Sequence, residues 1–202
     1  LKNAQYSLGV MYYHGQGVQQ NYKEAFKWFK LSSEQGVVAA QYNLGYFYDQ
    51  GKGISQDCMK AFNLYELSAK QGNALAQSNL GLLYNLGKVV SKNYKEATRL
   101  YRLSAEQGNK EGQYNLGTMY EKGQGVSQDY MEAFKWFKLS ADQGYGLAQR
   151  ILGLFYEFGK LGSKNNVLAH MWLNMASMQG DKDAAKDKRR VEKKMSPIQI
   201  EK

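Results

Sequence analysis

Cysteine and proline are almost absent from this chain of 202 residues, and long apolar runs are missing altogether. The single cysteine, Cys58, excludes an intrachain disulfide or a cysteine-rich metal site. Proline occurs only at Pro197 whereas glycine occurs 21 times, which favours helices joined by glycine turns over a proline-rich linker. No apolar run approaches the ~18 residues that a membrane-spanning helix needs, so we expect no transmembrane segment.

Histidine is also rare, and only His14 and His170 are present. Neither has a cysteine or carboxylate at metal-ligand spacing, and no recurring acid, base or nucleophile accompanies them. The Gly-x-Gly strings at 15–17, 51–53 and 123–125 lack the preceding strand and the Gly-Lys-Ser/Thr sequence of a phosphate-binding loop. We therefore predict no catalytic residue, no metal and no cofactor, and a protein that is not an enzyme.

The chain carries a formal net charge of +9, and 43% of its residues are hydrophobic. This apolar content can bury a substantial core. The positive charge favours acidic partners through long-range attraction. The first residue, Leu1, is not methionine and lies inside a repeat, so we expect that a leader or earlier repeats of a longer protein would lie upstream.

A repeat of 36 residues runs through the chain five times without an insertion. The recurring positions are Leu-Gly at 8–9, 44–45, 80–81, 116–117 and 152–153, tyrosine at 12, 48, 84, 120 and 156, alanine at 25, 61, 97, 133 and 169, and Gln-Gly ending at 36, 72, 108, 144 and 180. Five registers of this kind exclude coincidence, and internal repeats of this length indicate a solenoid.

Each half of a repeat has apolar residues at the spacing of one helical face. In the second repeat these are Ala40, Leu44, Phe47 and Tyr48 for the first helix (helix A), and Ala61, Phe62, Leu64 and Tyr65 for the second (helix B). The pattern predicts an antiparallel helix hairpin. A glycine inside a helix costs about 1 kcal/mol relative to alanine, so the recurring glycine of Leu-Gly predicts close packing of helix A on helix B.

The residues between the two helices predict where each helix ends and begins. Helix A should end at a left-handed glycine, a conformation that glycine adopts without strain. These glycines are Gly15, Gly51, Gly87, Gly123 and Gly159, and the residues predicted to cap helix B are Asn21, Asp57, Asn93, Asp129 and Asn165. Three residues later, Glu24, Glu96 and Glu132 are placed to complete a reciprocal cap.

These signals together predict an all-α protein, an α-solenoid of about five 36-residue antiparallel helix pairs with a C-terminal capping helix. The predicted repeats are 1–36, 37–72, 73–108, 109–144 and 145–180, and residues 181–202 form the basic capping helix and the start of a further helix. The absence of a linker favours one continuous array over two domains.

The recurring string Ala-Gln-Tyr-Asn-Leu-Gly-x-x-Tyr, followed by Ala-Phe-Lys-Trp-Phe and Ser-Ala-x-Gln-Gly, resembles the Sel-1-like repeat, a relative of the tetratricopeptide repeat. The resemblance extends over nearly the whole chain and is strongest at 40–72 and 112–144. The segment Met195-Ser196-Pro197 is similar to the cap of bacterial members, with Ser196 as the helix cap and Pro197 at the first helical position. The resemblance implies a bacterial interaction scaffold.

The predicted partner-binding residues lie on helix A and face away from helix B, on the concave side of the solenoid. They are Tyr6, Tyr13, Tyr42, Tyr46, Asp49, Asn85, Tyr114, Glu121, Arg150 and Glu157. These positions vary between repeats, as a specific binding surface requires, and tyrosine and arginine are frequent binding hot spots. The alternative interpretation is that the tyrosines pack against neighbouring repeats.

Basic residues gather in two other places. On helix B, Lys23, Lys27, Lys30, Arg99, Arg102, Lys135 and Lys138 indicate a solvated outer face. The denser cluster of Lys186, Lys188, Arg189, Arg190, Lys193 and Lys194 indicates a polar terminal cap. Contact of this cluster with anionic lipid or nucleic acid is the alternative.

We predict a non-enzymatic adaptor that binds another protein or peptide, acts as a monomer and is periplasmic or secreted rather than cytoplasmic. One alternative is an inhibitor or immunity protein that clasps a toxin or effector. Another is an RNA-binding helical repeat, which the positive charge would suit. The period and the Leu-Gly positions match the Sel-1-like pattern instead, so nucleic acid is the less favoured partner.

Overall fold

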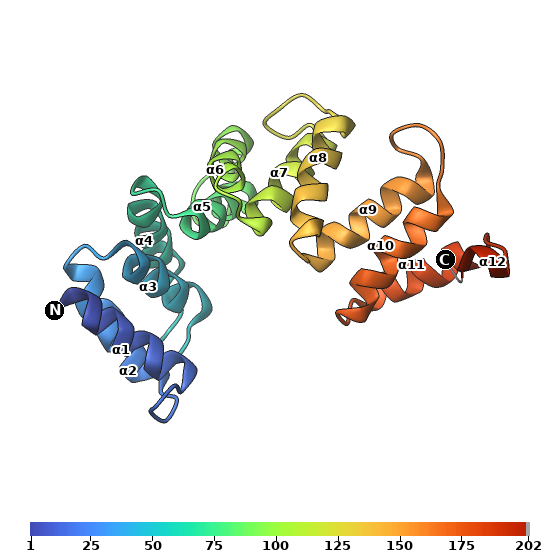
Figure 1. The fold of residues 1–202 in the computed structure, drawn as a ribbon. Coiled ribbons are helices and arrows are strands. Elements are labelled where there is room, and N and C mark those ends of the chain that lie inside the picture. The colour runs from blue at the N-terminus through green and yellow to red at the C-terminus, as the bar shows by residue number, and fades with distance from the viewer. Residues whose placement is uncertain (201–202) are drawn as a thin grey trace. The chain divides into compact units, whose positions relative to one another are not determined.

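The computed structural model describes residues 1–200, apart from the side chains of residues 197 and 200. In this part of the chain there are twelve α-helices and no strand (Figure 1). Their bounds are α1 Lys2–His14, α2 Tyr22–Glu34, α3 Val38–Gln50, α4 Cys58–Lys70, α5 Ala74–Leu86, α6 Tyr94–Glu106, α7 Lys110–Lys122, α8 Tyr130–Asp142, α9 Gly146–Phe158, α10 Asn166–Met178, α11 Lys182–Glu192 and α12 Pro197–Ile200. Helices α1 to α10 form five pairs, which confirms the predicted all-α solenoid fold.

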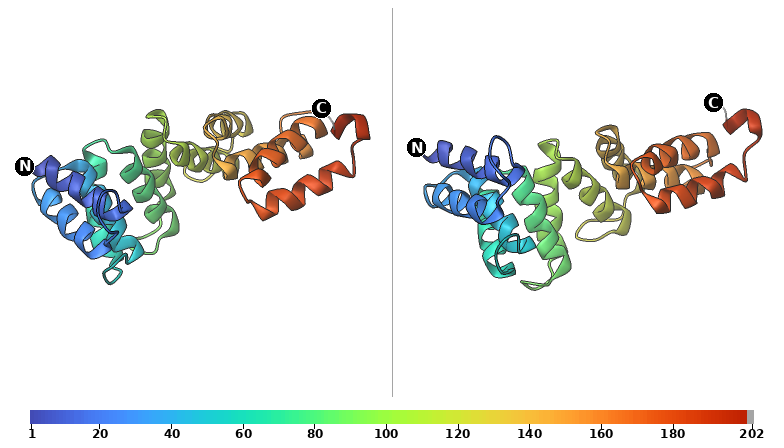
Figure 2. Two further views of the ribbon diagram at one scale, coloured as in Figure 1. Left: turned by 60° about the horizontal axis from the view of Figure 1, so that its bottom comes forward. Right: turned by 90° about the horizontal axis from the view of Figure 1, so that it is seen from below.

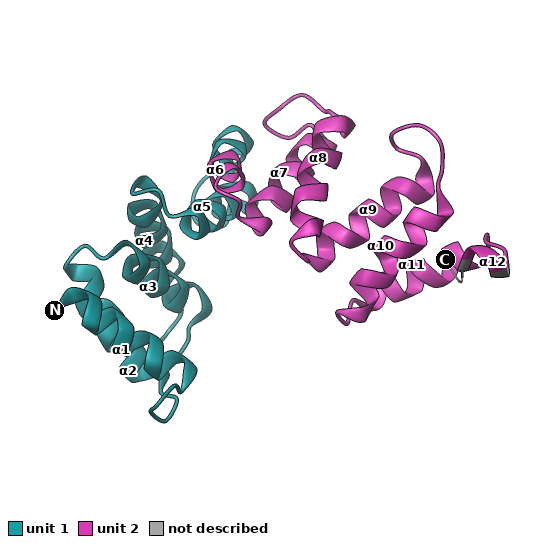
Figure 3. Ribbon diagram, in the orientation of Figure 1, with its two compact units in different colours: residues 1–100 teal, residues 101–202 magenta. Residues whose placement is uncertain are grey.

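The chain divides into two compact units, residues 1–100 and residues 101–202 (Figure 3). Unit 1 contains α1 to α5 and the first part of α6, and unit 2 contains the rest of α6 and α7 to α12. The division falls inside α6, between residues 100 and 101.

The turns between paired helices have the predicted glycine and cap at each end. The five glycines that follow the helix A segments all have positive φ, from 64° to 72°. The caps of helix B also bond as predicted: Asn21 accepts from the backbone N–H groups of Lys23 and Glu24, and Asn93 accepts from that of Glu96. Asp57, Asp129 and Asn165 bond in the same way.

The predicted reciprocal caps by glutamate are not formed. The backbone N–H of Asn21 donates to the carbonyl of Tyr12 on the preceding helix, so this donor is already hydrogen-bonded without the Glu24 carboxylate. Glu24 instead pairs with Lys27, one turn along its own helix. The N–H groups of Asn93 and Asp129 likewise donate to carbonyls of helix A tyrosines. The turn therefore joins the two helices through backbone hydrogen bonds, which the local sequence pattern does not reveal.

The repeated small residues bring paired helices into close contact. Five alanines of helix B are fully buried, namely Ala25, Ala61, Ala97, Ala133 and Ala169. A Cβ added at Gly45 would lie 2.9 Å from the ring of Tyr65, and one added at Gly117 would lie 2.9 Å from the ring of Phe137. Both rings belong to the partner helix, which confirms that the glycine of Leu-Gly allows close packing.

Buried glutamines connect the ends of the hairpins. In unit 1, Gln71 at the end of α4 donates to the side-chain oxygen of Gln41 on α3. Gln77 at the start of α5 donates to the carbonyl of Ala69 on α4, and so links one hairpin to the next. In unit 2, Gln143 donates to Gln113 in the same way. Gln41, Gln77 and Gln113 are buried and hydrogen-bonded, as buried polar groups usually are, whereas Gln71 and Gln143 are exposed at the ends of their helices.

Unit 2 ends in α11, which lies alongside α10 (Figure 2), and in the short helix α12. The buried residues of α11 are Ala184, Asp187 and Val191, and Val191 packs with Ala169 and Leu173 of α10. Helix α12 begins at Pro197 as predicted, and the backbone N–H of Ser196 donates to the side-chain oxygen of Gln199. Residues 201 and 202 of the predicted terminal segment lie outside the described residues. Among the helices of residues 1–200, none has the length and apolar character needed to cross a membrane.

Replacing Asp129 with alanine should lower the free energy of unfolding by about 1 kcal/mol. The Asp129 carboxylate accepts hydrogen bonds from the backbone N–H groups of Met131 and Glu132, and alanine would leave both groups without this acceptor. Urea denaturation followed by circular dichroism measures the change. Asp129→Asn is the control and should stay near the wild-type value, and an equal loss in both variants would contradict the capping role.

Candidate functional site

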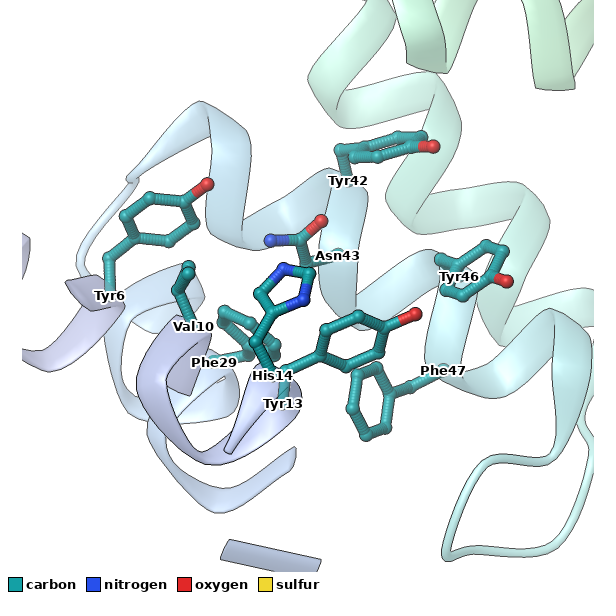
Figure 4. A pocket seen from close by; sticks show the side chains of 9 residues that line it. All are labelled: Tyr6, Val10, Tyr13, His14, Phe29, Tyr42, Asn43, Tyr46 and Phe47. Carbon is teal, nitrogen blue, oxygen red and sulfur yellow. The ribbon is translucent and has the colours of Figure 1, made fainter. Parts of the chain in front are cut away.

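A pocket of about 380 Å³ opens between α1 and α3 in unit 1 (Figure 4). We call it the tyrosine pocket, and its lining residues are Tyr6, Val10, Tyr13 and His14 of α1, Phe29 of α2, and Tyr42, Asn43, Tyr46 and Phe47 of α3. The lining side chains of α1 and α3 come from two successive repeats. Stacking of the first two hairpins therefore creates the pocket.

The walls of the tyrosine pocket are held by aromatic packing. Phe29 and Phe47 are each only 1% exposed, and their ring centroids are 5.6 Å apart. Tyr6 packs on Phe29 with a centroid distance of 5.8 Å, and Tyr13 packs on Phe47 at the same distance. Because the floor is buried and the upper rings remain half-buried, the pocket presents fixed aromatic surfaces to solvent.

Polar groups complete the mouth of the pocket. The side chains of His14 and Asn43 lie among the tyrosine rings, and the His14 ring meets that of Tyr13 edge-on at 4.8 Å (Figure 4). The amide of Asn43 can both donate and accept hydrogen bonds. None of the nine lining residues carries a carboxylate.

Lys52 lies beside the pocket, over the rings of two residues that line it. Its Nζ is 4.9 Å from the ring centroid of Tyr13, 5.1 Å from that of Tyr46 and 5.4 Å from that of Tyr22. It also donates a hydrogen bond of 2.9 Å to the Tyr13 hydroxyl, which raises the pKa of Lys52. The ammonium group is therefore held in place and charged at neutral pH.

Tyr65 of α4 packs against α3. The ring of Tyr65 is 1% exposed, occupies the space that Gly45 leaves free and lies 5.9 Å from the ring of Tyr42. Burial raises the pKa of Tyr65, and the nearby Asp49 carboxylate raises it further. Asp49, a predicted binding residue, is half-buried and accepts a hydrogen bond from the side chain of Gln50.

The helix A surface of unit 2 differs because ion pairs cover much of it. Arg150 donates to Asp187 at 2.8 Å and to Asp183 at 3.3 Å, and both carboxylates belong to α11. Glu157 is 1% exposed and pairs with Arg190 at 2.6 Å and with Lys194 at 2.8 Å. The hydrogen bond from Arg190 lowers the pKa of Glu157 and outweighs burial, which acts in the opposite direction.

Glu157, one of the predicted binding residues, is buried because the C-terminal segment supplies its cationic partners. Its partner Arg190 belongs to α11, which follows the fifth hairpin and covers this side chain. Arg150 is similarly engaged by the cap. The Glu157 side chain is thereby shielded from solvent, while that of Arg150 stays 29% exposed.

The other predicted residues of unit 2 have mixed surroundings. Glu121 is ion-paired with Lys160. Tyr114 packs against Phe137 at 5.8 Å and against Tyr145 of the following repeat at 5.3 Å. Tyr114 therefore matches the alternative interpretation, in which a tyrosine packs against its neighbours.

Four of the ten predicted binding residues come together at the tyrosine pocket, namely Tyr6, Tyr13, Tyr42 and Tyr46. Asp49 and Asn85 are half-buried in unit 1 and do not line it. The sequence interpretation missed His14, Asn43 and Lys52. Asn43 follows a predicted residue directly and His14 follows Tyr13, so a wider inner stripe would have included both. The position of Lys52 depends on the conformation of the turn after α3, and no pattern in the sequence predicts it.

The basic residues behave as a solvated face and a cap. On helix B, Lys27, Lys30 and Lys135 form exposed ion pairs with carboxylates one turn away in their own helices. Such pairs are each worth at most about 1 kcal/mol. In the cap, Lys188 lies 3.7 Å from Glu192, which also contacts His170 at 3.1 Å. Within residues 1–200, no group of three or more His, Cys, Asp or Glu residues could hold a metal ion.

The sequence matches the family model described as "Sel1 repeat" five times, at residues 2–37, 38–73, 74–109, 110–145 and 146–181. These ranges have the predicted period and begin one residue later than the predicted repeats. A comparison with curated proteins gives no significant match.

Solved structures with the same fold include close relatives in sequence. A Sel1 repeat protein from Oxalobacter formigenes is 33% identical, with a TM-score of 0.86, and the match covers 93% of this chain and 75% of that chain. A protective antigen of uropathogenic Escherichia coli strains is 35% identical, with a TM-score of 0.82, and the match covers 99% of this chain but only 44% of the antigen.

An immunity protein from Pseudomonas aeruginosa is 22% identical, with a TM-score of 0.61, over 91% of this chain and 68% of that one. At this identity the likeness shows the fold alone. The five family matches span 180 of the 202 residues, from 2 to 181, and agree with the two closer structural likenesses. This chain therefore belongs to the Sel1 repeat family.

Proposed function

We propose that this protein is an adaptor that binds a partner protein or peptide on the helix A surface of unit 1, with the tyrosine pocket as its main contact. Sel1 repeat proteins generally mediate protein–protein interactions. The observation that carries the proposal is the pocket itself, where four tyrosines, His14 and Asn43 surround a buried aromatic floor. Aromatic residues in a fixed wall lose little conformational entropy on binding and frequently dominate binding energy.

An adaptor role suits the chemistry of the pocket better than catalysis does. The lining residues supply phenol rings, one imidazole and one amide. The lining set offers His14 no carboxylate to orient it and no cysteine or serine that it could activate as a nucleophile. Sel1 repeat proteins are typically non-enzymatic scaffolds, and the proposal follows that pattern.

We also propose a periplasmic or secreted location, in keeping with the notion of a bacterial interaction scaffold. Separation of periplasmic and cytoplasmic fractions, followed by immunoblotting of the native protein, tests the location. Recovery with a cytoplasmic marker would contradict it.

Photo-crosslinking tests the proposed binding surface directly. We expect p-benzoylphenylalanine in place of Tyr46 to crosslink a partner protein in cells of the source organism, and mass spectrometry then identifies the partner. The control places the same residue at Met59 on α4, which is 52% exposed and belongs to the other helix of the pair. Equal crosslinking from both positions, or from Met59 alone, would contradict a helix A binding surface.

Affinity for the crosslinked partner should fall by about tenfold or more in Tyr46→Ala, because this variant removes one wall of the pocket. Met59→Ala should bind like the wild type. Surface plasmon resonance with the purified partner measures both affinities, and circular dichroism checks that both variants remain folded. Unchanged affinity of folded Tyr46→Ala would exclude the tyrosine pocket as the main contact.

A further inference from the structure

Lysine occupies the same position in three repeats, as Lys52, Lys88 and Lys160. Of these, Lys52 and Lys160 lie over aromatic rings and have different partners. Lys52 and Lys160 are separated by 108 residues, which is three periods of 36. Each lies over the ring of a tyrosine that begins a helix B, at 5.4 Å from the centroid: Tyr22 for Lys52 and Tyr130 for Lys160. The two lysines therefore share this contact, one in unit 1 and one in unit 2, while their other rings are Tyr13 and Tyr46 for Lys52 and Phe155 for Lys160.

The two sites differ in the residue that the lysine contacts on the preceding helix A. Lys160 forms an ion pair with Glu121, which lies 39 residues before it. The residue 39 positions before Lys52 is Tyr13, and Lys52 donates to its neutral hydroxyl. Among the described residues, the side chains that act on the Lys52 ammonium are those of Tyr13 and Tyr46, and no carboxylate is among them. The Lys160 cation is thus neutralised by a carboxylate of its own chain, whereas the Lys52 ammonium, within the described part of the chain, contacts only tyrosines.

The geometry points to a partner segment that supplies the missing carboxylate: we propose that the tyrosine pocket accepts a bulky apolar or aromatic side chain while Lys52 binds a carboxylate within two residues of it. This inference rests on the proposed function and names the chemistry of the partner.

Charge and size both support this occupant. The Lys52 ammonium has three N–H donors and gives one to Tyr13, so further donors remain for a carboxylate. No lining residue of the pocket carries a negative charge that would repel an acidic segment. A volume of about 380 Å³ lies at the lower end of the range for ligand pockets, about 300–1,000 Å³, and suits a large side chain. The buried rings of Phe29 and Phe47 provide an apolar floor for it.

Short blocked peptides provide the test, measured by NMR titration of the whole ¹⁵N-labelled chain. The probes are Ac-Gly-Glu-Phe-Gly-NH₂ and Ac-Gly-Glu-Gly-Phe-Gly-NH₂, each with a version that has glutamine for glutamate and a version that has alanine for phenylalanine. A further probe, Ac-Gly-Gly-Phe with a free C-terminal carboxylate, distinguishes a terminal carboxylate from a side-chain one. The signals followed are the backbone and side-chain amides of Asn43, which lines the pocket.

In the wild type, we expect a glutamate peptide to bind about fivefold more tightly than its glutamine version, the difference expected for a partly exposed ion pair. The phenylalanine peptide should also bind more tightly than its alanine version. Lys52→Gln should remove the preference for glutamate and keep that for phenylalanine, and Lys52→Arg should restore both. Lys160→Gln, the matched change in unit 2, should leave both preferences intact.

Three results would overturn the inference. These are equal binding of the glutamate and glutamine peptides, a glutamate preference that survives Lys52→Gln, and no shift of the Asn43 signals at millimolar peptide. The proposed function can be judged separately, because a protein crosslinked through Tyr46 would still support the helix A surface even if Lys52 and acidic peptides play no part.

Discussion

Gly117→Leu is expected to lower the free energy of unfolding by about 3 kcal/mol, as overpacking of a close helix contact does. A Cβ at this position would lie 2.9 Å from ring atoms of Phe137 and 3.2 Å from the carbonyl oxygen of Ala133. Phe137 is fully buried, so its ring cannot move aside into solvent. Helices α7 and α8 would have to separate, and urea denaturation followed by circular dichroism measures the resulting loss.

A pair of alanine variants separates packing from helix propensity. Alanine is favoured over glycine in a helix by about 1 kcal/mol, so propensity alone would make Gly117→Ala more stable. We expect it to be less stable, because the contact with Phe137 outweighs that gain. Gly146→Ala is the control: its Cβ would approach only the flexible side chain of Gln179, at 3.3 Å, and stability should not fall. If Gly117→Ala were stabilised as much as Gly146→Ala, the packing role of the glycine would be wrong.

Glu157→Gln should destabilise the protein by about 2 kcal/mol at pH 7, the scale of a lost hydrogen-bonded charge pair, because Arg190 and Lys194 remain partly exposed and Arg190 keeps Asp187. The Glu157 side chain is 0% exposed, and its two oxygens accept from Arg190 and Lys194. Glutamine keeps the shape but loses the charge, so both cations would lose their buried carboxylate. Urea denaturation measures the loss, with Asp142→Asn in the exposed pair with Lys138 as the control.

The effect of Glu157 should also depend on pH in a defined direction. Its pKa in the folded protein is lowered from the ordinary value of 4.5, chiefly by the hydrogen bond from Arg190. In the acidic range the unfolded chain therefore binds more protons than the folded one, and stability rises with pH. The contribution of Glu157 is present above pH 4.5 and is lost as the pH falls through the lowered folded pKa. The difference between wild type and Glu157→Gln should shrink over this range; a constant difference would show that charge is not its origin.

The beginnings and ends of the helices were largely predictable from local sequence. Gly51 ends α3 with positive φ, and the side chain of Asp57 caps α4, as the pattern indicates. These features depend on neighbours within a few residues, so the spacing of residue types is enough to identify them. The prediction of a reciprocal cap by Glu24 was wrong. The backbone N–H of Asn21, from which Glu24 was expected to accept a hydrogen bond, donates across the turn to the carbonyl of Tyr12 instead.

The candidate site was predictable only in part. The criterion that binding residues of helix A face away from helix B identified Tyr6, Tyr13, Tyr42 and Tyr46, because helical periodicity determines which residues share a face. Periodicity does not say what lies opposite that face. Arg150 and Glu157 have the same register as the tyrosines, but side chains of α11 and of Lys194, which follows it, pair with them.

The sequence by itself determined the 36-residue period, the helix pairs, their caps and the glycines at which paired helices touch, because each depends on short-range hydrogen bonding or on the helical repeat. Only the tertiary structure decided which inner positions stay open. That choice depends on side chains about 30 to 40 residues apart, such as Lys52 with Tyr13 and Arg190 with Glu157. Stacking of successive hairpins brings these residues together. In unit 1 it places Lys52 beside an open aromatic pocket, and in unit 2 it buries Glu157 in an ion pair with Arg190.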